Sequence, residues 1–111
     1  IGAGVPEDFS YKLPETMLEA DILKWKAALL PAEKALKRLG MGEMQEGYAG
    51  ADINPLVRQG VLGFGLRMDS STYWPIHHTH ADTIDKIDPM LLRKNTAAMA
   101  IWAWSLANIE L

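Results

Sequence analysis

The pattern of apolar and polar positions along the chain predicts two long amphipathic helices. In the first, apolar side chains recur at steps of three and four, which is typical of one helix face. Thr16 and Glu19 have the spacing of a capping box and predict its start, and Gly40 predicts its end. Because Pro31 removes one backbone hydrogen bond, we expect a kink there or two abutting helices. The apolar stripe consists of Leu18, Ile22, Trp25, Leu29, Ala32, Leu36 and Leu39.

The segments around this helix are rich in turn-forming residues. Residues 1–15 contain two prolines and two glycines and predict a loop. Residues 43–46 are compatible with a short strand, and residues 47–55 predict turns. Asp52 is placed to cap a short helix that runs through Arg58.

A strand and the second long helix complete the pattern. Val61–Met68 predicts a buried strand, whose glycines allow another backbone to approach closely. Asp88 and Pro89 have the residue types that begin a helix. The alternation of helix and strand predicts an α/β layered fold. One side of the last helix consists of Leu91, Ala98, Trp102 and Ile109, with Leu92, Met99 and Leu106 adjacent.

Composition narrows the function classes. The 111 residues are 49% hydrophobic and 23% charged, which is typical of one globular domain. The net charge of −3 argues against a nucleic-acid surface. The absence of cysteine excludes disulfides and thiolate metal sites. The longest apolar run, residues 97–107, is too short to span a bilayer.

All three histidines of the chain fall within residues 77–80. Histidine is the commonest metal ligand, so this loop is the candidate for metal chemistry. His78 and His80 are two positions apart and would face the same way in an extended segment. Asp82 could accept a hydrogen bond from a ligating imidazole and fix its orientation. The alternative from spacing alone is a solvated polar loop in which the histidines are incidental.

Residues 78–83, His-Thr-His-Ala-Asp-Thr, resemble the His-Thr/Ser-x-x-Asp-Thr element of the co-catalytic zinc aminopeptidase and glutamate carboxypeptidase family. The resemblance covers residues 20–111 and is most specific from 50 to 89. The doubled histidine at 77–78 is most similar to the carboxypeptidase Q-like branch and its bacterial relatives. The segments that follow the family's order and spacing are 50–56, 59–66, 73–74 and 82–89, followed by an Ala-rich final helix.

The resemblance implies a role for each matching residue. His78 matches the family's last zinc ligand, and Asp82 and Thr83 match the end of the motif, where they would hold the ligand or the loop in place. His77 occupies a position beside the ligand, so a substrate-pocket role is implied for it. Tyr73, with the neighbouring Trp74, would line the same pocket, although packing is the alternative.

Other residues depart from the family pattern or lie outside its chemistry. Leu62 replaces a proline that is usual in the family, and this change should not affect the chemistry. His80 lies at a variable position and is expected to face solvent. Asp52 matches an element of the family pattern upstream of the histidines. A role as a loop-stabilising cap is as compatible with that match as a catalytic role. Asp69 and Asp85, like the capping Asp88, lie at positions that the family does not use as ligands.

The resemblance also implies a fold and a mechanism. Residues 1–111 would be the C-terminal portion of a single catalytic domain with the three-layer α/β/α, phosphorylase/hydrolase-like fold, and its N-terminal remainder would lie outside this chain. Two zinc ions would be held by a histidine, a bridging aspartate, a glutamate, a second aspartate and the final histidine, with another glutamate as general base. Only the final histidine is present, so the isolated chain is expected to be inactive and to hold no zinc stably.

For the intact protein, the resemblance implies hydrolysis of terminal peptide bonds of peptides through a metal-activated water. The implied partners are a peptide substrate, the N-terminal remainder and a second copy in a homodimer. Export to the periplasm or outside the cell is also implied. Trp25, Trp102 and Trp104 would pack on the remainder or on the second copy.

Two alternatives stay open. The first is a non-catalytic binding domain of the same fold, as in transferrin-receptor-like proteins. The second is a self-contained metal-binding protein that uses His78, His80 and Asp82. The choice between aminopeptidase and carboxypeptidase specificity depends on residues outside this chain.

Overall fold

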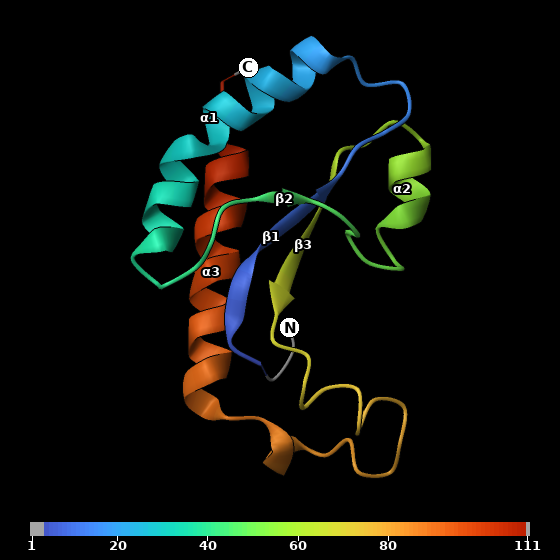
Figure 1. The fold of residues 1–111 in the computed structure, drawn as a ribbon, viewed down its shortest axis with the longest axis vertical. Coiled ribbons are helices and arrows are strands. Elements are labelled where there is room, and N and C mark those ends of the chain that lie inside the picture. The colour runs from blue at the N-terminus through green and yellow to red at the C-terminus, as the bar shows by residue number, and fades with distance from the viewer. Residues whose placement is uncertain (1–3, 111) are drawn as a thin grey trace.

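A three-stranded mixed sheet forms the centre of the computed structural model, which describes residues 4–110. The strand order is β2-β1-β3, so β1 is the central strand (Figure 1). It pairs in parallel with β2 and antiparallel with β3, with Phe9 opposite Leu66 and Tyr11 opposite Phe64. The strands are β1 (Pro6–Lys12), β2 (Gln45–Glu46) and β3 (Gly63–Met68). The helices are α1 (Glu19–Lys37), α2 (Asn54–Arg58), α3 (Pro89–Ala107) and the 3-10 turn η1 (Ile84–Lys86).

One face of this sheet packs against α1 and α3. Phe9 of β1 stacks on Trp102 of α3, with the ring centroids 4.4 Å apart and the planes 9° from parallel. Phe64 of β3 meets the same indole edge-on, at 5.4 Å. Each of these aromatic pairs stabilises the fold beyond the area it buries. The buried core consists of Phe9, Leu29, Ala32, Leu36, Met41, Ala98 and Trp102.

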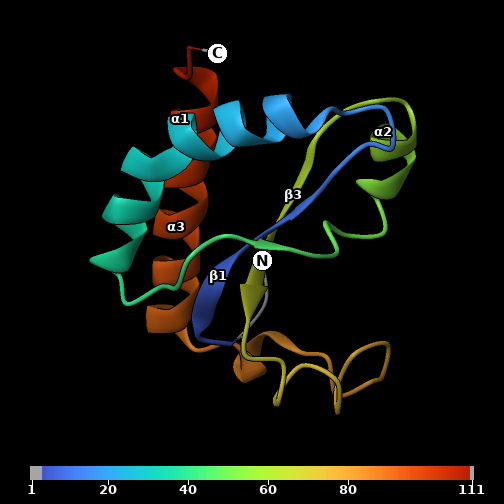
Figure 2. The ribbon, with the colours of Figure 1, turned by 45° about the horizontal axis from the view of Figure 1, so that its top comes forward.

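The opposite face of the sheet is covered by residues 47–53 and α2. The hydroxyl of Ser10 donates to the carbonyl of Tyr48 at 2.6 Å. A Cβ on Gly65 would lie 3.0 Å from the carbonyl oxygen of Ala49, so the glycine allows the close backbone approach predicted for this strand. Figures 1 and 2 both show α1 and α3 on one side of the strands and α2 on the other. The predicted α/β layering is confirmed.

The predicted first helix is confirmed, but its predicted start is wrong. The residue before α1 is Leu18, and no side chain caps this end, so Thr16 lies outside the helix. The helix continues through Pro31 without separating into two, and its ribbon bends along its length (Figure 1). Gly40 ends the segment as predicted, since it has φ +77° and its N–H donates to the carbonyl of Lys37 at 3.0 Å.

The prediction of a loop over residues 1–15 is wrong, because β1 occupies Pro6–Lys12. The strand is buried on both faces, so it lacks the alternation of apolar and polar residues that marks a half-exposed strand. Proline is compatible with the first position of a strand, where Pro6 lies. The part of the prediction that concerns residues 1–3 lies outside the described residues.

The other element predictions are confirmed, with one correction to a cap. The short strand and the strand at 61–68 correspond to β2 and β3, and the short helix corresponds to α2. Asp52 does not cap α2, because the helix begins later and Ile53 precedes it without a side-chain cap. Asp88 does cap α3, since its carboxylate accepts the N–H groups of Met90 at 2.7 Å and Leu91 at 3.3 Å.

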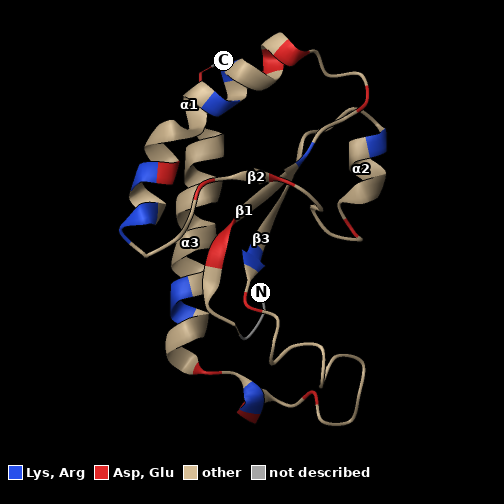
Figure 3. Cartoon of the chain, viewed as in Figure 1, with Lys and Arg blue, Asp and Glu red and all other residues tan. Residues whose placement is uncertain are grey.

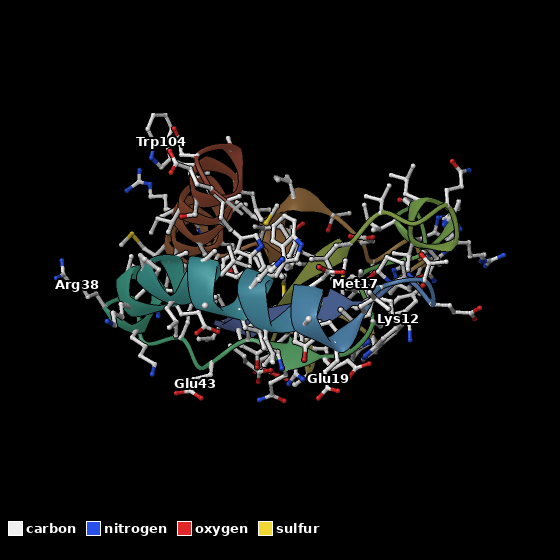
Figure 4. All side chains as sticks on the ribbon, turned by 90° about the horizontal axis from the view of Figure 1, so that it is seen from above. Lys12, Met17, Glu19, Arg38, Glu43 and Trp104 are labelled. Carbon is white, nitrogen blue, oxygen red and sulfur yellow. The ribbon has the colours of Figure 1, made fainter. Side chains whose placement is uncertain are left out.

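The tryptophans of α3 differ sharply in environment. Trp102 is 3% exposed and packs on this chain's own Phe9, so it needs neither a further segment nor a second copy to cover it. Trp104 is 73% exposed, and Figure 4 shows its ring at the outer side of the helix. No helix in the described part of the chain is long and apolar enough to cross a membrane.

An ion pair between buried Asp8 and exposed Arg67 joins the two main strands. The carboxylate of Asp8 is nearly inaccessible, and its Oδ1 lies 3.2 Å from Nε of Arg67 on β3. Burial raises the pKa of the Asp8 carboxyl above its ordinary value, and the guanidinium of Arg67 opposes this rise only in part. The charged form of Asp8 therefore opposes folding.

The Phe9–Trp102 stack gives a direct test of the core. Replacing Trp102→Ala removes the buried ring on which Phe9 of β1 and Phe64 of β3 pack. It should lower the free energy of unfolding by about 3–5 kcal/mol. The matched control is Trp104→Ala, on the same helix but exposed, for which the change should stay within about 0.5 kcal/mol. Urea unfolding followed by circular dichroism measures both, and equal losses would contradict this packing.

The buried carboxylate gives a pH-dependent prediction. Because the folded-state pKa of Asp8 is raised, the folded state takes up the proton first as pH falls, and this group's contribution to stability improves. The variant Asp8→Asn lacks this gain. The difference in free energy of unfolding, variant minus parent, should therefore be larger at pH 7 than at pH 4. Unfolding curves at both pH values measure the difference. A difference independent of pH, or larger at pH 4, would show that the carboxylate is not desolvated.

Candidate metal-binding loop

The histidines lie in the loop of residues 69–88, which joins β3 to α3 and projects from one end of the sheet (Figure 1). At its start, the N–H of Asp69 donates to the carbonyl of Val5 at 2.9 Å. Gly4 lies so close that an added Cβ would be 1.8 Å from the carbonyl oxygen of Asp69. At its end, Asp88 caps α3. Both ends of the loop are thus fixed to the body of the protein.

Within the loop, the backbone follows a series of tight turns. The N–H of His77 donates to the carbonyl of Tyr73 at 2.9 Å, and the N–H of Thr79 donates to that of Ile76 at 3.0 Å. The hydroxyl of Thr79 also donates to Ile76, at 2.6 Å. The extended segment in which His78 and His80 would face the same way is therefore not formed.

His78 has an unusual backbone conformation. Its φ is +58°, and among the described residues it is the only one other than glycine with a positive φ. This left-handed conformation costs an L-residue about 1–2 kcal/mol. Such strain concentrates at functional sites, where the surrounding structure enforces it. The side chain of His78 is exposed at this turn.

An aromatic cluster adjoins His78. The ring of His77 stacks on Tyr73, with centroids 4.5 Å apart and planes 28° from parallel, and meets Trp74 edge-on at 5.5 Å. The ring of His78 contacts His77 edge-on at 3.8 Å. The hydroxyl of Tyr73 lies 3.4 Å from Nε2 of His77. The structure therefore brings together Tyr73, His77 and His78, three of the residues for which the sequence predicts a site role.

The acidic residues of the loop divide into two groups. Asp69 accepts hydrogen bonds from the N–H and hydroxyl of Ser71, which lower the pKa of its carboxyl. Lys86, 2.6 Å away, and the Thr83 hydroxyl lower the pKa of Asp85 to about 2. Asp82, by contrast, is exposed, and no hydrogen bond or ion pair joins its carboxylate to another described residue. Thr83 thus bonds to its neighbours within the loop, whereas Asp82 is available for a partner outside residues 4–110.

Around His78 the surface lacks formal charge. Residues 70–81 include no Lys, Arg, Asp or Glu, and Figure 3 shows this stretch as the uncoloured, projecting part of the loop. A cavity of about 560 Å³ lies at the other end of β1 and β3, lined by Lys12, Thr16, Asn54 and Arg58 among others, and is separate from this loop.

A complete metal site is not formed by residues 4–110, in which no three His, Asp or Glu side chains are placed to hold one ion. A self-contained metal site of His78, His80 and Asp82 therefore finds no support in the geometry. Of the two exposed imidazoles in the loop, those of His78 and His80, that of His78 has an aromatic neighbour, the ring of His77. A catalytic zinc requires three protein ligands and an open position. His78 fits the role of one such ligand.

Comparison with known proteins decides the family. No family model matches the chain. Carboxypeptidase Q of Rattus norvegicus is 31% identical over 87 residues, which cover 78% of this chain and 18% of the relative. The crystal structure of a peptidase M28 precursor from Shewanella amazonensis SB2B aligns with a TM-score of 0.80 and 32% identity, over 99% of this chain and 23% of that one. The chain belongs to the carboxypeptidase Q-like branch of the co-catalytic zinc exopeptidases.

Membership of this metallopeptidase family confirms the resemblance inferred from the histidine motif, and the structural match confirms the α/β zinc-exopeptidase fold. Carboxypeptidase Q of Homo sapiens gives the same result, at 29% identity over 78% of this chain and 18% of the relative. The chain thus spans about a fifth of the length of the relatives it matches. For this carboxypeptidase Q-like chain, the roles of His77, His78, Asp82 and Thr83 stay predictions, as does its place within a single larger domain.

Two residues at the base of the loop were missed by the sequence reasoning. Gly4 lies in the loop predicted over residues 1–15, and the predictions include no role for Asn95. The amide of Asn95, which is fully buried, donates to the carbonyl of Gly4 at 3.0 Å. A signal was present, because Asn95 lies three and seven residues before Ala98 and Trp102, on the apolar stripe of α3. A polar residue on such a stripe requires a specific partner.

The left-handed conformation of His78 can be tested by substitution. Glycine adopts a positive φ without steric cost, whereas alanine retains the strain. We therefore expect His78→Gly to have a free energy of unfolding about 0.5–1 kcal/mol higher than His78→Ala. Thermal or urea unfolding measures the difference. If the alanine variant were the more stable of the two, the turn would not be strained at this residue.

Proposed function

We propose that this chain is part of a zinc-dependent exopeptidase that hydrolyses terminal peptide bonds of peptides, with His78 as one zinc ligand. The observation that supports this most strongly is the backbone of His78. An exposed imidazole at a left-handed residue, in a loop fixed at both ends, is preorganised for a partner that residues 4–110 do not supply. The match to carboxypeptidase Q and to a peptidase M28 precursor supports the same chemistry.

Zinc, when bound, supplies a Lewis acid that polarises the scissile carbonyl and lowers the pKa of a water molecule beside it. The contribution of this chain is to position the ligand. The ring contact with His77 at 3.8 Å limits the rotation of the His78 imidazole. Asp82 lies four residues further on, exposed, and in our proposal it orients the site by accepting a hydrogen bond from outside the loop.

In the same proposal, His77 and Tyr73 contact the substrate. Their stacked rings form a rigid edge beside His78, and Trp74 extends it with an indole that is 67% exposed. Because residues 70–81 are uncharged, this edge is suited to apolar groups and neutral amides of a peptide. The charged terminus of the peptide would have to be recognised elsewhere in the intact protein.

The proposal also assigns most of the catalytic machinery to chain outside these 111 residues. His78 is one ligand where zinc requires at least three, and we expect the general base to be a glutamate upstream of this chain. We therefore expect the isolated 111-residue chain to be inactive. The alternative is a non-catalytic binding domain of the same fold. It predicts that the upstream His-x-Asp, Glu-Glu and Asp positions are replaced.

The test uses the full-length protein and a matched pair of variants. Replacing His78→Ala should remove one zinc ion per chain and lower kcat/KM for a dipeptide by about 100-fold or more. The control His80→Ala changes the same residue type two positions away and should leave zinc content and rate unchanged. Zinc is measured by atomic absorption after gel filtration.

Full zinc content and full rate in the His78→Ala variant would refute the role of His78. A full-length protein that is folded but binds no zinc and hydrolyses no peptide would favour the binding-domain alternative.

A further inference from the structure

The loop that presents His78 is attached to the rest of the protein mainly through its two ends. Within the described residues, one hydrogen bond joins residues 69–87 to a residue outside 69–92, and it runs from the N–H of Asp69 to the carbonyl of Val5, at 2.9 Å. The remaining bonds are turns and side-chain contacts inside the loop, together with the cap at Asp88. The location of His78 is therefore set by whatever fixes these two ends.

Both ends are connected to α3. Asp88 caps the first turn of this helix. Asn95 lies seven residues later, about two helical turns further along, and its amide donates to the carbonyl of Gly4 at 3.0 Å. Gly4 in turn lies against the carbonyl of Asp69, too close to allow any side chain. The contacts run from α3 through Asn95 and Gly4 to the start of the loop.

An asparagine at position 95 is energetically unfavourable if its only role is packing. It is 0% exposed and lies on the stripe of α3 that also contains Ala98 and Trp102, where an apolar residue would avoid the desolvation of an amide. A buried amide that donates to one defined carbonyl fixes the register between two segments. Here those segments are α3 and the stretch at Gly4 that adjoins the start of the loop.

We propose that Asn95 is a positioning residue of the zinc site. Asn95 holds Gly4 against Asp69 and so fixes the start of the His78 loop relative to α3. The same helix fixes the end of the loop, because Asp88 caps it. The inference rests on the proposed function, because it takes His78 as a zinc ligand. Asn95 contacts neither the metal nor the substrate in this proposal, and loss of its hydrogen bond weakens zinc binding through the position of the loop.

The test compares full-length protein with Asn95→Leu, which keeps the number of side-chain heavy atoms and the branch at Cγ and removes the donor. Zinc affinity, measured by competition with a chelator on protein shown to be folded by circular dichroism, should fall by about 10–100-fold. Amide hydrogen exchange at Asp69 should become faster. The control Thr96→Val changes the next residue of α3, which is exposed and bonds within its own helix, and should change neither quantity.

Each outcome decides the proposal. Unchanged zinc affinity in folded Asn95→Leu overturns it, and faster exchange at Asp69 in that case marks Asn95 as merely structural. If Asn95→Leu does not fold, Asn95→Ser, whose hydroxyl is too short to reach Gly4, is judged by the same two measurements. If unsubstituted full-length protein binds no zinc, the proposed function itself fails and this inference with it. A fall in affinity confined to the Asn95 variants, together with faster exchange at Asp69, confirms the inference.

Discussion

The antiparallel pairing of β1 with β3 is the constraint on which the rest of the structure depends. Along this pair, the aromatic residues face α1 and α3, while Ser10 and Gly65 face the segment that leads to α2. The pairing also places the beginning of β1 beside the end of β3, where the histidine loop starts. A single strand pair thus determines both the layering of the fold and the location of the candidate site.

Much of this fold could be predicted from the sequence, and the failures have physical causes. The long helices have apolar stripes, β3 is an apolar run with glycines, and Asp88 caps α3 as its residue type indicates. The central strand β1 was missed because it is covered on both faces, which removes the alternation that marks a half-exposed strand. The caps expected at Thr16 and Asp52 failed because the helices begin later than predicted, directly after Leu18 and Ile53, neither of which has a side chain that caps.

For the site, the sequence indicated the loop but not its construction. The grouping of Tyr73, His77 and His78 followed from their proximity in the chain and from the family motif. The left-handed backbone of His78 could not be predicted, because histidine has no intrinsic preference strong enough to require it. The connection of Asn95 to Gly4 spans 91 positions and depends on how α3 packs against the start of β1.

In our proposal, the loop presents a zinc ligand, His78, whose backbone is preorganised before the metal binds, and the further ligands belong to chain outside residues 4–110. The most direct test of that account is an anomalous difference map at the zinc edge, from crystals of the full-length protein grown with zinc. The account predicts a zinc peak about 2.0–2.1 Å from a ring nitrogen of His78, with the remaining ligands contributed by residues upstream of Gly4. A map in which zinc is bound elsewhere and the imidazole of His78 contacts no metal would contradict it.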